Sequence, residues 1–103
     1  MGSPMRIRAT NAGGVTNVKV LMQHDMETGQ RKDASGAVVP AWFITELKAT
    51  HNGKVVLEGQ FGASVSKNPF LEFKFKGGEK GDKVAVNWVD NKGDSRTDEV
   101  QIG

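Results

Sequence analysis

The 103-residue chain contains no cysteine. That absence excludes disulfides, zinc–thiolate knuckles, iron–sulfur clusters and thiol nucleophiles, although it does not fix the cellular compartment. No apolar run approaches the roughly 18 residues that a membrane-spanning helix requires. The chain also has no large excess of charge of either sign: it has 14 basic and 12 acidic residues, and a formal charge of +2 gives no argument for nucleic-acid binding. What remains is the composition of one ordinary globular domain.

The first four residues read like a cloning remnant ahead of a native start at Met5. We therefore leave residues 1–4 out of the fold argument and expect one domain over residues 5–103. No charged segment followed by an apolar one comes after Met5. We expect that the protein stays inside the cell, that a leader was removed, or that a partner carries the export signal.

Apolar and polar residues alternate with period two along most of the chain, and no stretch supports a helix of useful length. In the clearest strand, residues 70–76, Leu71, Phe73 and Phe75 face one way and three charged residues face the other. In residues 83–90, Val84, Val86 and Trp88 share one face, and the opposite face still carries Ala85 and Val89. Apolar residues on both faces predict a central strand. The full set of expected strands is 5–10, 15–23, 42–50, 54–61, 70–76, 83–90 and 95–102.

Turn residues separate these strands at regular intervals. Asn52-Gly53 predicts a type I′ hairpin, because this dipeptide tolerates the two positive φ angles best. A second hairpin is expected at residues 90–94, and only residues 24–41 form a long polar connection, with a short strand possible at 37–39. The fold class predicted is all-β: an immunoglobulin-like β-sandwich of about seven antiparallel strands in two sheets.

Catalytic and metal chemistry find little support in the residues. His24 lies near Asp25 and Glu27, but the other histidine, His51, is separated from it by a strand and a loop, whereas zinc sites want three or four ligands in a closed set. We expect surface histidines with capping or loop roles and no metal or cofactor. No nucleophile elbow or triad is present, and the adjacent carboxylates of residues 98 and 99 point to opposite faces of a strand, so we expect no enzyme.

Aromatic residues are interpreted first as core. Phe73 and Phe75 lie on the face opposite the lysines, which favours burial over stacking on nucleic acid. Trp88 also belongs to the core, where its N–H needs a buried acceptor. Trp42 and Phe43 must point in opposite directions, so one of them is expected at an edge or an interface.

The most distinctive segment, residues 24–29, reads His-Asp-Met-Glu-Thr-Gly. It resembles the His-Pro-Met-Glu-Thr-Gly loop of the SoxZ family, with Asp25 where proline is usual, a change that frees the φ angle. The similarity continues in order: Asn-Gly at 52–53, Asn-Pro-Phe at 68–70, a tryptophan at 88 with Asp-Asn at 90–91 and glycine at 93, and an acidic residue at 99. It spans almost the whole chain, from residue 5 to 102.

The resemblance implies an immunoglobulin-like sandwich that pairs with SoxY. In the family, the cysteine of a C-terminal Gly-Gly-Cys-Gly-Gly arm of SoxY carries sulfur intermediates in thiosulfate oxidation, and SoxZ itself carries no sulfur. The family's complex is periplasmic, and SoxY supplies the export signal for both subunits. The resemblance therefore implies a heterodimer with a SoxY-like protein and indirect contact with other sulfur-oxidation enzymes; self-association of the isolated subunit stays open. From the small net charge and the lack of a long apolar run, we expect no contact with nucleic acid or membrane.

The residues expected to bind the partner lie in and around this loop: His24, Met26, Glu27, Trp42, Asn68 and Phe70. Two of them have a structural alternative. Met26 adapts its shape to partners or else staples the loop onto its own sandwich, and for Phe70 a core position at the start of a strand is favoured. A rival function is a free-standing module for carbohydrate or single-stranded nucleic acid, with an exposed Trp42 as its platform.

Overall fold

The computed structural model describes residues 2–62 and 64–103, so Met1 of the expected cloning remnant lies outside the described residues. The described residues form seven β-strands and no helix, and thus contain no helix of the length and apolarity needed to cross a membrane. The strands are β1 (Arg6–Ala12), β2 (Val15–Leu21), β3 (Ile44–His51), β4 (Lys54–Gln60), β5 (Phe70–Lys76), β6 (Lys83–Asp90) and β7 (Ser95–Gln101).

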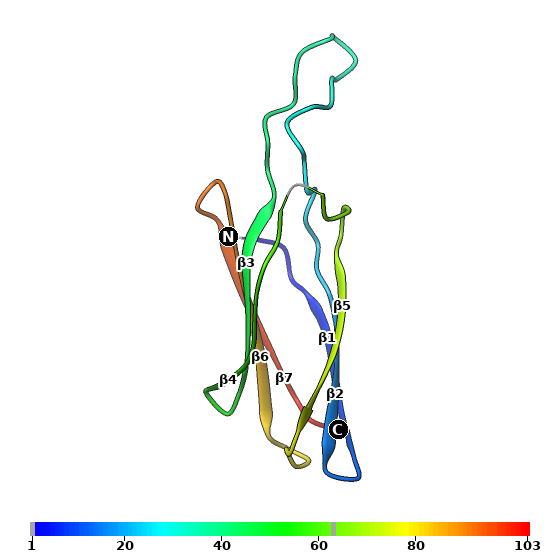
Figure 1. The fold of residues 1–103 in the computed structure, drawn as a ribbon, viewed down its shortest axis with the longest axis vertical. Coiled ribbons are helices and arrows are strands. Elements are labelled where there is room, and N and C mark those ends of the chain that lie inside the picture. The colour runs from blue at the N-terminus through cyan, green and yellow to red at the C-terminus, as the bar shows by residue number, and fades with distance from the viewer. Residues whose placement is uncertain (1, 63) are drawn as a thin grey trace.

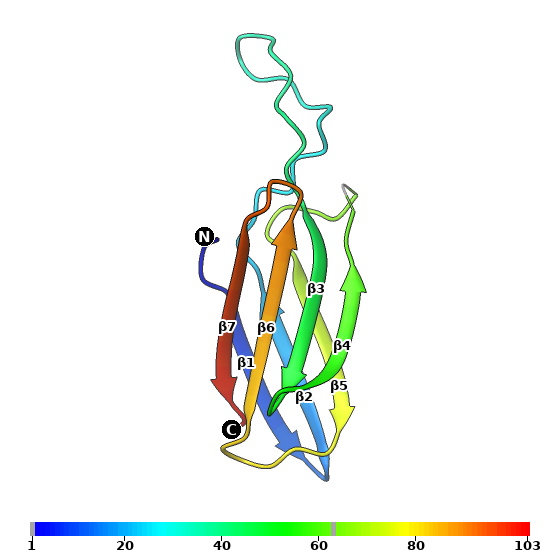
Figure 2. The ribbon, with the colours of Figure 1, turned by 90° about the vertical axis from the view of Figure 1, so that its left-hand side faces the viewer.

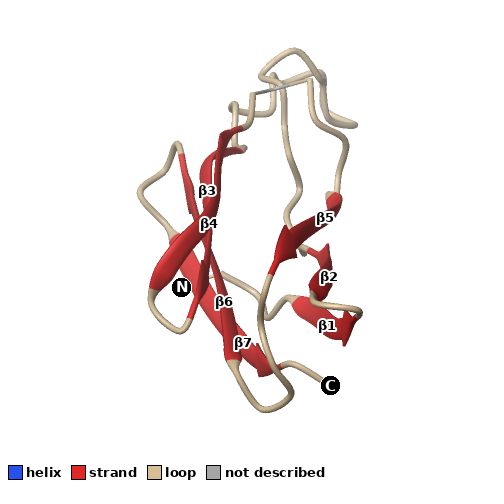
Figure 3. Cartoon of the chain, turned by 60° about the horizontal axis from the view of Figure 1, so that its bottom comes forward, coloured by secondary structure: helices blue, strands red, loops and turns tan. Residues whose placement is uncertain are grey.

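These strands build two facing sheets (Figures 2 and 3). One sheet has the order β1-β2-β5 and the other β4-β3-β6-β7, and every pairing between neighbouring strands is antiparallel. The predicted all-β sandwich is confirmed, and so is the central place of β6, which lies between β3 and β7. The partial burial of its outward residues follows from that place.

The core is formed by alternate residues of both sheets. Val18, Val20 and Met22 of the β2 segment are fully buried, and across the interior Val84 and Val86 of β6 are fully buried too. The other buried apolar residues of the core are Met5, Ala9, Met26, Ile44, Leu47, Ala49, Trp88 and Ile102. Because each buried aliphatic side chain contributes roughly 1.5–3 kcal/mol, this face-to-face burial is what holds the two sheets together.

Two turns show why the sequence needs particular residues there. Asn52 and Gly53 have φ angles of 49° and 86°, which confirms the predicted type I′ hairpin between β3 and β4. Gly78 lies in the connection from β5 to β6 with φ at 90°, and a β-carbon there would collide with the Thr16 hydroxyl and approach Ile102 to 3.1 Å. Glycine is therefore required at this position for both conformation and space.

Phe70 departs from the expected core position: its side chain is 62% exposed. The alternation that turns the partly buried Leu71, Phe73 and Phe75 toward the core leaves residue 70 on the opposite, outer face with Glu72. The favoured core interpretation of Phe70 was therefore wrong, because strand parity outweighs hydrophobicity at the first residue of β5.

A long hairpin-like segment, here called the finger (residues 25–41), connects β2 to β3 and projects beyond both sheets (Figures 1 and 2). It gives the molecule its elongated extents of 53 × 20 × 19 Å. The expected short strand at 37–39 is reduced to one isolated bridge between Lys32 and Val38. At the tip, the Asp33 carboxylate accepts hydrogen bonds from the amides of Ser35 and Ala37 and from the Ser35 hydroxyl, which fixes a tight turn.

Candidate partner-docking site

The base of the finger is closed by backbone pairing. The amide of Glu27 donates to the carbonyl of Trp42 (2.6 Å), and the amide of Trp42 donates back to the carbonyl of Glu27 (2.9 Å). Next to this bridge, the Asn91 side chain accepts from the Phe43 amide (2.8 Å) and donates to the Ala41 carbonyl (2.9 Å). The two arms of the finger are thus tied to each other and to the β6–β7 turn.

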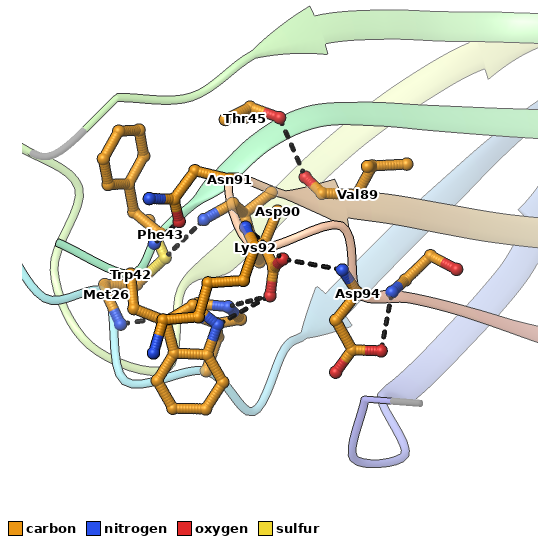
Figure 4. A network of polar contacts seen from close by, with 12 residues as sticks. Met26, Trp42, Phe43, Thr45, Val89, Asp90, Asn91, Lys92 and Asp94 are labelled. Carbon is orange, nitrogen blue, oxygen red and sulfur yellow. Dashed lines mark hydrogen bonds and ion pairs between the residues drawn. The ribbon is translucent and has the colours of Figure 1, made fainter. Parts of the chain in front are cut away.

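Asp90, the last residue of β6, organises the polar contacts under this base (Figure 4). Its Oδ2 accepts hydrogen bonds from His24 Nε2 (3.0 Å) and Trp42 Nε1 (2.7 Å). Its Oδ1 accepts from the amides of Lys92 and Asp94, both at 2.9 Å. With its side chain fully buried, the carboxylate has four donors, as a buried charge requires.

The same contacts set the acidity of Asp90. Burial alone would raise its pKa, but the hydrogen bonds from His24, Trp42 and the two backbone amides outweigh it and leave the pKa below the ordinary value. Asp90 is therefore ionised at neutral pH. A charged carboxylate strengthens each of these hydrogen bonds, since charge-assisted bonds are roughly twice as strong as neutral ones.

His24 is buried at 5% exposure, so the expectation of a surface histidine was wrong at this position. Its Nδ1 accepts a hydrogen bond from the Met26 amide (3.1 Å). The proton of the neutral ring must then lie on Nε2, which is the nitrogen that donates to Asp90. The ring also packs edge-on against Trp88 and tilted against Trp42, with centroid distances of 5.1 and 4.8 Å.

Met26 takes the structural role. It has φ of 52°, a left-handed conformation that is uncommon for a residue with a β-carbon. Its side chain is only 5% exposed, and its sulfur accepts from the Ile44 amide at 3.3 Å. The methionine therefore staples the finger to the sandwich, and a direct contact with a partner through this side chain stays a prediction.

Glu27 and Asn68 hold neighbouring segments. The Arg31 Nε donates to both carboxylate oxygens of Glu27 at 3.0 and 2.9 Å, and this hydrogen bond and the charge of Glu27 raise the pKa of Arg31. Asn68, with φ of 51°, exchanges two hydrogen bonds with His24: its Oδ1 accepts from the His24 amide, and its own amide donates to the His24 carbonyl. Residues 68–70 are thereby fixed beside the finger base.

The structure brings together five of the six expected residues: His24, Met26, Glu27, Trp42 and Asn68. The sixth residue, Phe70, follows Asn68 closely in the chain, but its side chain is exposed on the outer face of β5 and takes no part in these contacts. Sequence reasoning missed the central role of Asp90, which it had placed only in a hairpin motif. The acceptor expected for the Trp88 N–H is not found either, since this buried nitrogen has no hydrogen-bond partner among the described residues.

No group of three histidine, aspartate or glutamate side chains that could hold a metal occurs among residues 2–62 and 64–103. The second histidine, His51, donates from Nε2 to the Asp82 carboxylate at 2.8 Å, at the opposite end of the sandwich. What the site offers chemically is a rigid base of satisfied hydrogen bonds that positions an exposed finger, whose Val38 is 57% exposed.

The sequence model of one protein family, described as "Sulphur oxidation protein SoxZ", matches residues 5–101. The chain belongs to the SoxZ family. The resemblance inferred from the finger and hairpin motifs is confirmed, and membership makes the chain a subunit of a sulfur-oxidation Sox system. No curated protein matches the chain in sequence.

Solved structures similar to this SoxZ family member share its fold. A hypothetical protein PH1083 from Pyrococcus horikoshii OT3 has a TM-score of 0.67 at 19% identity, covering 98% of this chain and 88% of that one. A superoxide reductase (neelaredoxin) from Archaeoglobus fulgidus has a TM-score of 0.61 at 18% identity, covering 99% and 90%. At these identities the likeness concerns architecture alone.

Proposed function

We propose that this chain is the non-catalytic subunit of a SoxYZ-type sulfur carrier, which binds a SoxY-like protein and presents its cysteine-bearing arm during thiosulfate oxidation. Family membership over residues 5–101 is the observation that carries the proposal. The complete lack of cysteine agrees with it, because a thiolate is needed to hold a sulfur intermediate covalently and this chain has none.

The geometry supports a presenting role. A carrier arm that visits several enzymes needs a rigid body beside it, and the finger base supplies rigidity through the buried Asp90 carboxylate and its four donors. The finger extends this body past both sheets (Figure 1), with an exposed apolar residue, Val38, near its tip. Exposed apolar side chains on an ordered protrusion are suited to contact with another protein.

The rival function, a free-standing binding module, depended on Trp42 as an open stacking platform. The structure leaves Trp42 half-buried, with its N–H on Asp90, His24 packed against it and the Lys92 ammonium 4.6 Å from its ring. An indole that is engaged in this way is not available as a flat surface for a sugar or a base. The carrier-subunit function is therefore the one that the geometry favours.

Co-expression tests the proposal. We expect the chain and a SoxY-like protein to co-elute in size-exclusion chromatography as one complex that survives dilution. A finger variant in which residues 32–38 are replaced by a two-residue turn should keep the fold, since the removed part makes no core contact, and should bind the partner less well. Separate elution of the two wild-type proteins would overturn the proposal.

Export is part of the same proposal: we infer a periplasmic location, reached together with the partner. Cell fractionation after expression with and without the partner's leader peptide tests it. The chain should reach the periplasm only when the partner has its leader. Periplasmic chain without any partner would contradict export as a complex.

A further inference from the structure

The outer face of the three-stranded sheet carries a concentrated positive charge. The registers of β1, β2 and β5 place twelve outward residues in four rows of three. From the finger end, the rows are Arg6–Leu21–Phe70, Arg8–Lys19–Glu72, Thr10–Asn17–Lys74 and Ala12–Val15–Lys76. Five basic residues and one acidic residue give this face a net charge of +4, whereas the whole chain carries +2.

None of these five basic side chains has an ion-pair or hydrogen-bond partner within the part of the chain that the structure describes. The single acidic residue, Glu72, accepts a hydrogen bond instead from the side-chain Nδ2 of Asn17 at 3.1 Å. The outer face of the other sheet is different: Lys48 lies 3.9 Å from Glu58, and Lys83 lies 3.9 Å from Glu99. Only one face of the sandwich is thus cationic and unpaired.

The row nearest the finger adds an apolar corner. Leu21 and Phe70 are direct cross-strand neighbours, exposed at 38% and 62%, and Arg6 completes their row. An aromatic residue, an aliphatic residue and an arginine together are the composition of an interface centre. Phe70 lies two residues after Asn68, whose side chain accepts a hydrogen bond from the His24 amide, so this corner is continuous with the base of the finger.

Protection of sheet edges does not explain the pattern. Lysines on edge strands prevent unwanted pairing, and β1 and β5 are the two edges of this sheet. Lys19, however, is on the central strand β2, and the exposed Phe70 works against such protection. A nucleic-acid surface is not favoured either, because stacking needs several exposed aromatic residues and this face has one, at its corner.

We propose that this face, together with the Leu21–Phe70 corner, is the docking surface for an acidic protein surface bearing an apolar projection, and that the SoxY-like partner supplies it. The assignment of the partner rests on the proposed function. The strand spacings give the face about 20 by 10 Å between side-chain origins, smaller than the roughly 800 Å² per partner of a standard interface. Contact must therefore extend from the corner onto the adjoining finger base.

Binding of the purified partner measured by biolayer interferometry at two salt concentrations tests the proposal. The double variant Arg8→Glu/Lys74→Glu should weaken binding at least tenfold, mostly through a slower association rate, and should flatten the salt dependence. Phe70→Ala should weaken binding about fivefold or more through faster dissociation. The matched control Lys48→Glu/Lys83→Glu, on the opposite face, should change the dissociation constant less than twofold, and all variants should keep the wild-type melting temperature within a few degrees.

Three outcomes would overturn the proposal, and they can be told apart. If the wild-type chain does not bind the partner at all, the proposed function falls together with this surface. If the wild type binds but both double variants change affinity equally, only the surface is wrong. Tighter binding of a 20-nucleotide oligo-dT or of phosphatidylserine vesicles than of the partner, lost in Arg8→Glu/Lys74→Glu, would assign the face to nucleic acid or membrane and equally refute an acidic protein.

Discussion

The substitution Asp90→Asn tests the polar centre of the finger base most sharply. It keeps the shape of the side chain but replaces one acceptor oxygen by a donor amide. If the amide faces outward to the turn, the N–H groups of Lys92 and Asp94 lose their acceptor. If it faces inward, Trp42 Nε1 loses its acceptor. The N–H of His24 then also loses its acceptor, or the His24 proton moves to Nδ1 and the Met26 amide loses its acceptor instead.

In both orientations two buried or half-buried donors are left without an acceptor. At about 1–3 kcal/mol for each of the two unsatisfied groups, the free energy of unfolding should fall by about 2–6 kcal/mol. At roughly 5 °C for each kcal/mol in a domain of this size, that corresponds to a decrease of roughly 10–30 °C in the melting temperature. Urea denaturation measures the free energy of unfolding. In Asp90→Asn, the rate of amide hydrogen exchange should increase most at Met26 and Glu27.

The control is Asp25→Asn, an exposed aspartate in the same segment that makes no hydrogen bond among the described residues. It should change the free energy of unfolding by less than about 0.5 kcal/mol. If Asp90→Asn were as mild as Asp25→Asn, the carboxylate would not organise the finger base and the argument for a preorganised site would fail.

Three further predictions concern the whole sandwich. The pKa values of Asp82, Asp90 and Asp98 are lowered in the folded state from the ordinary 3.8, so these carboxylates stabilise the fold above that pH, and the stabilisation is lost as the pH falls through their lowered pKa values. Urea denaturation at a series of pH values should show a free energy of unfolding that falls below about pH 5, less steeply in Asp90→Asn. A free energy that does not change with pH would contradict this prediction. Phe70→Ala should lower the free energy of unfolding by less than about 0.5 kcal/mol, whereas Leu47→Ala, at a 3% exposed position, should lower it by about 2–5 kcal/mol, as measured by thermal unfolding. Equal losses would place Phe70 in the core. Gly78→Ala should lower the melting temperature clearly more than Gly13→Ala, because both have positive φ but only Gly78 lacks space for a β-carbon; the reverse order would refute the packing at Thr16.

Most of the fold could be predicted because the alternation is regular and the turn residues are specific. The expected strands 70–76 and 83–90 have the observed limits, and the others differ by one or two residues at their ends. At residues 22–23 and 42–43 the expected strands are too long, since Met22 already bonds to the Pro69 carbonyl and Trp42 pairs with Glu27 across the finger base. Such pairings join distant segments and leave no periodic signal.

The candidate site was only partly accessible to sequence reasoning. The distinctive loop was found, but alternation cannot say that His24 turns inward onto Asp90, 66 positions away. A histidine shortly after β2, a tryptophan shortly before β3 and an aspartate at the end of β6 were a usable signal, because a buried carboxylate needs several donors. The charge of the outer face needed the register of β1, β2 and β5, which no single strand pattern contains.

Native mass spectrometry of the chain co-expressed with a SoxY-like protein tests the central claim most directly. The account predicts a complex heavier than the partner alone by the 11.1 kDa of one copy of this chain. After exposure to the thiosulfate-oxidising system, added sulfur mass should appear on the partner only. A spectrum with the two proteins as separate species, or with sulfur attached to this cysteine-free chain, would contradict it.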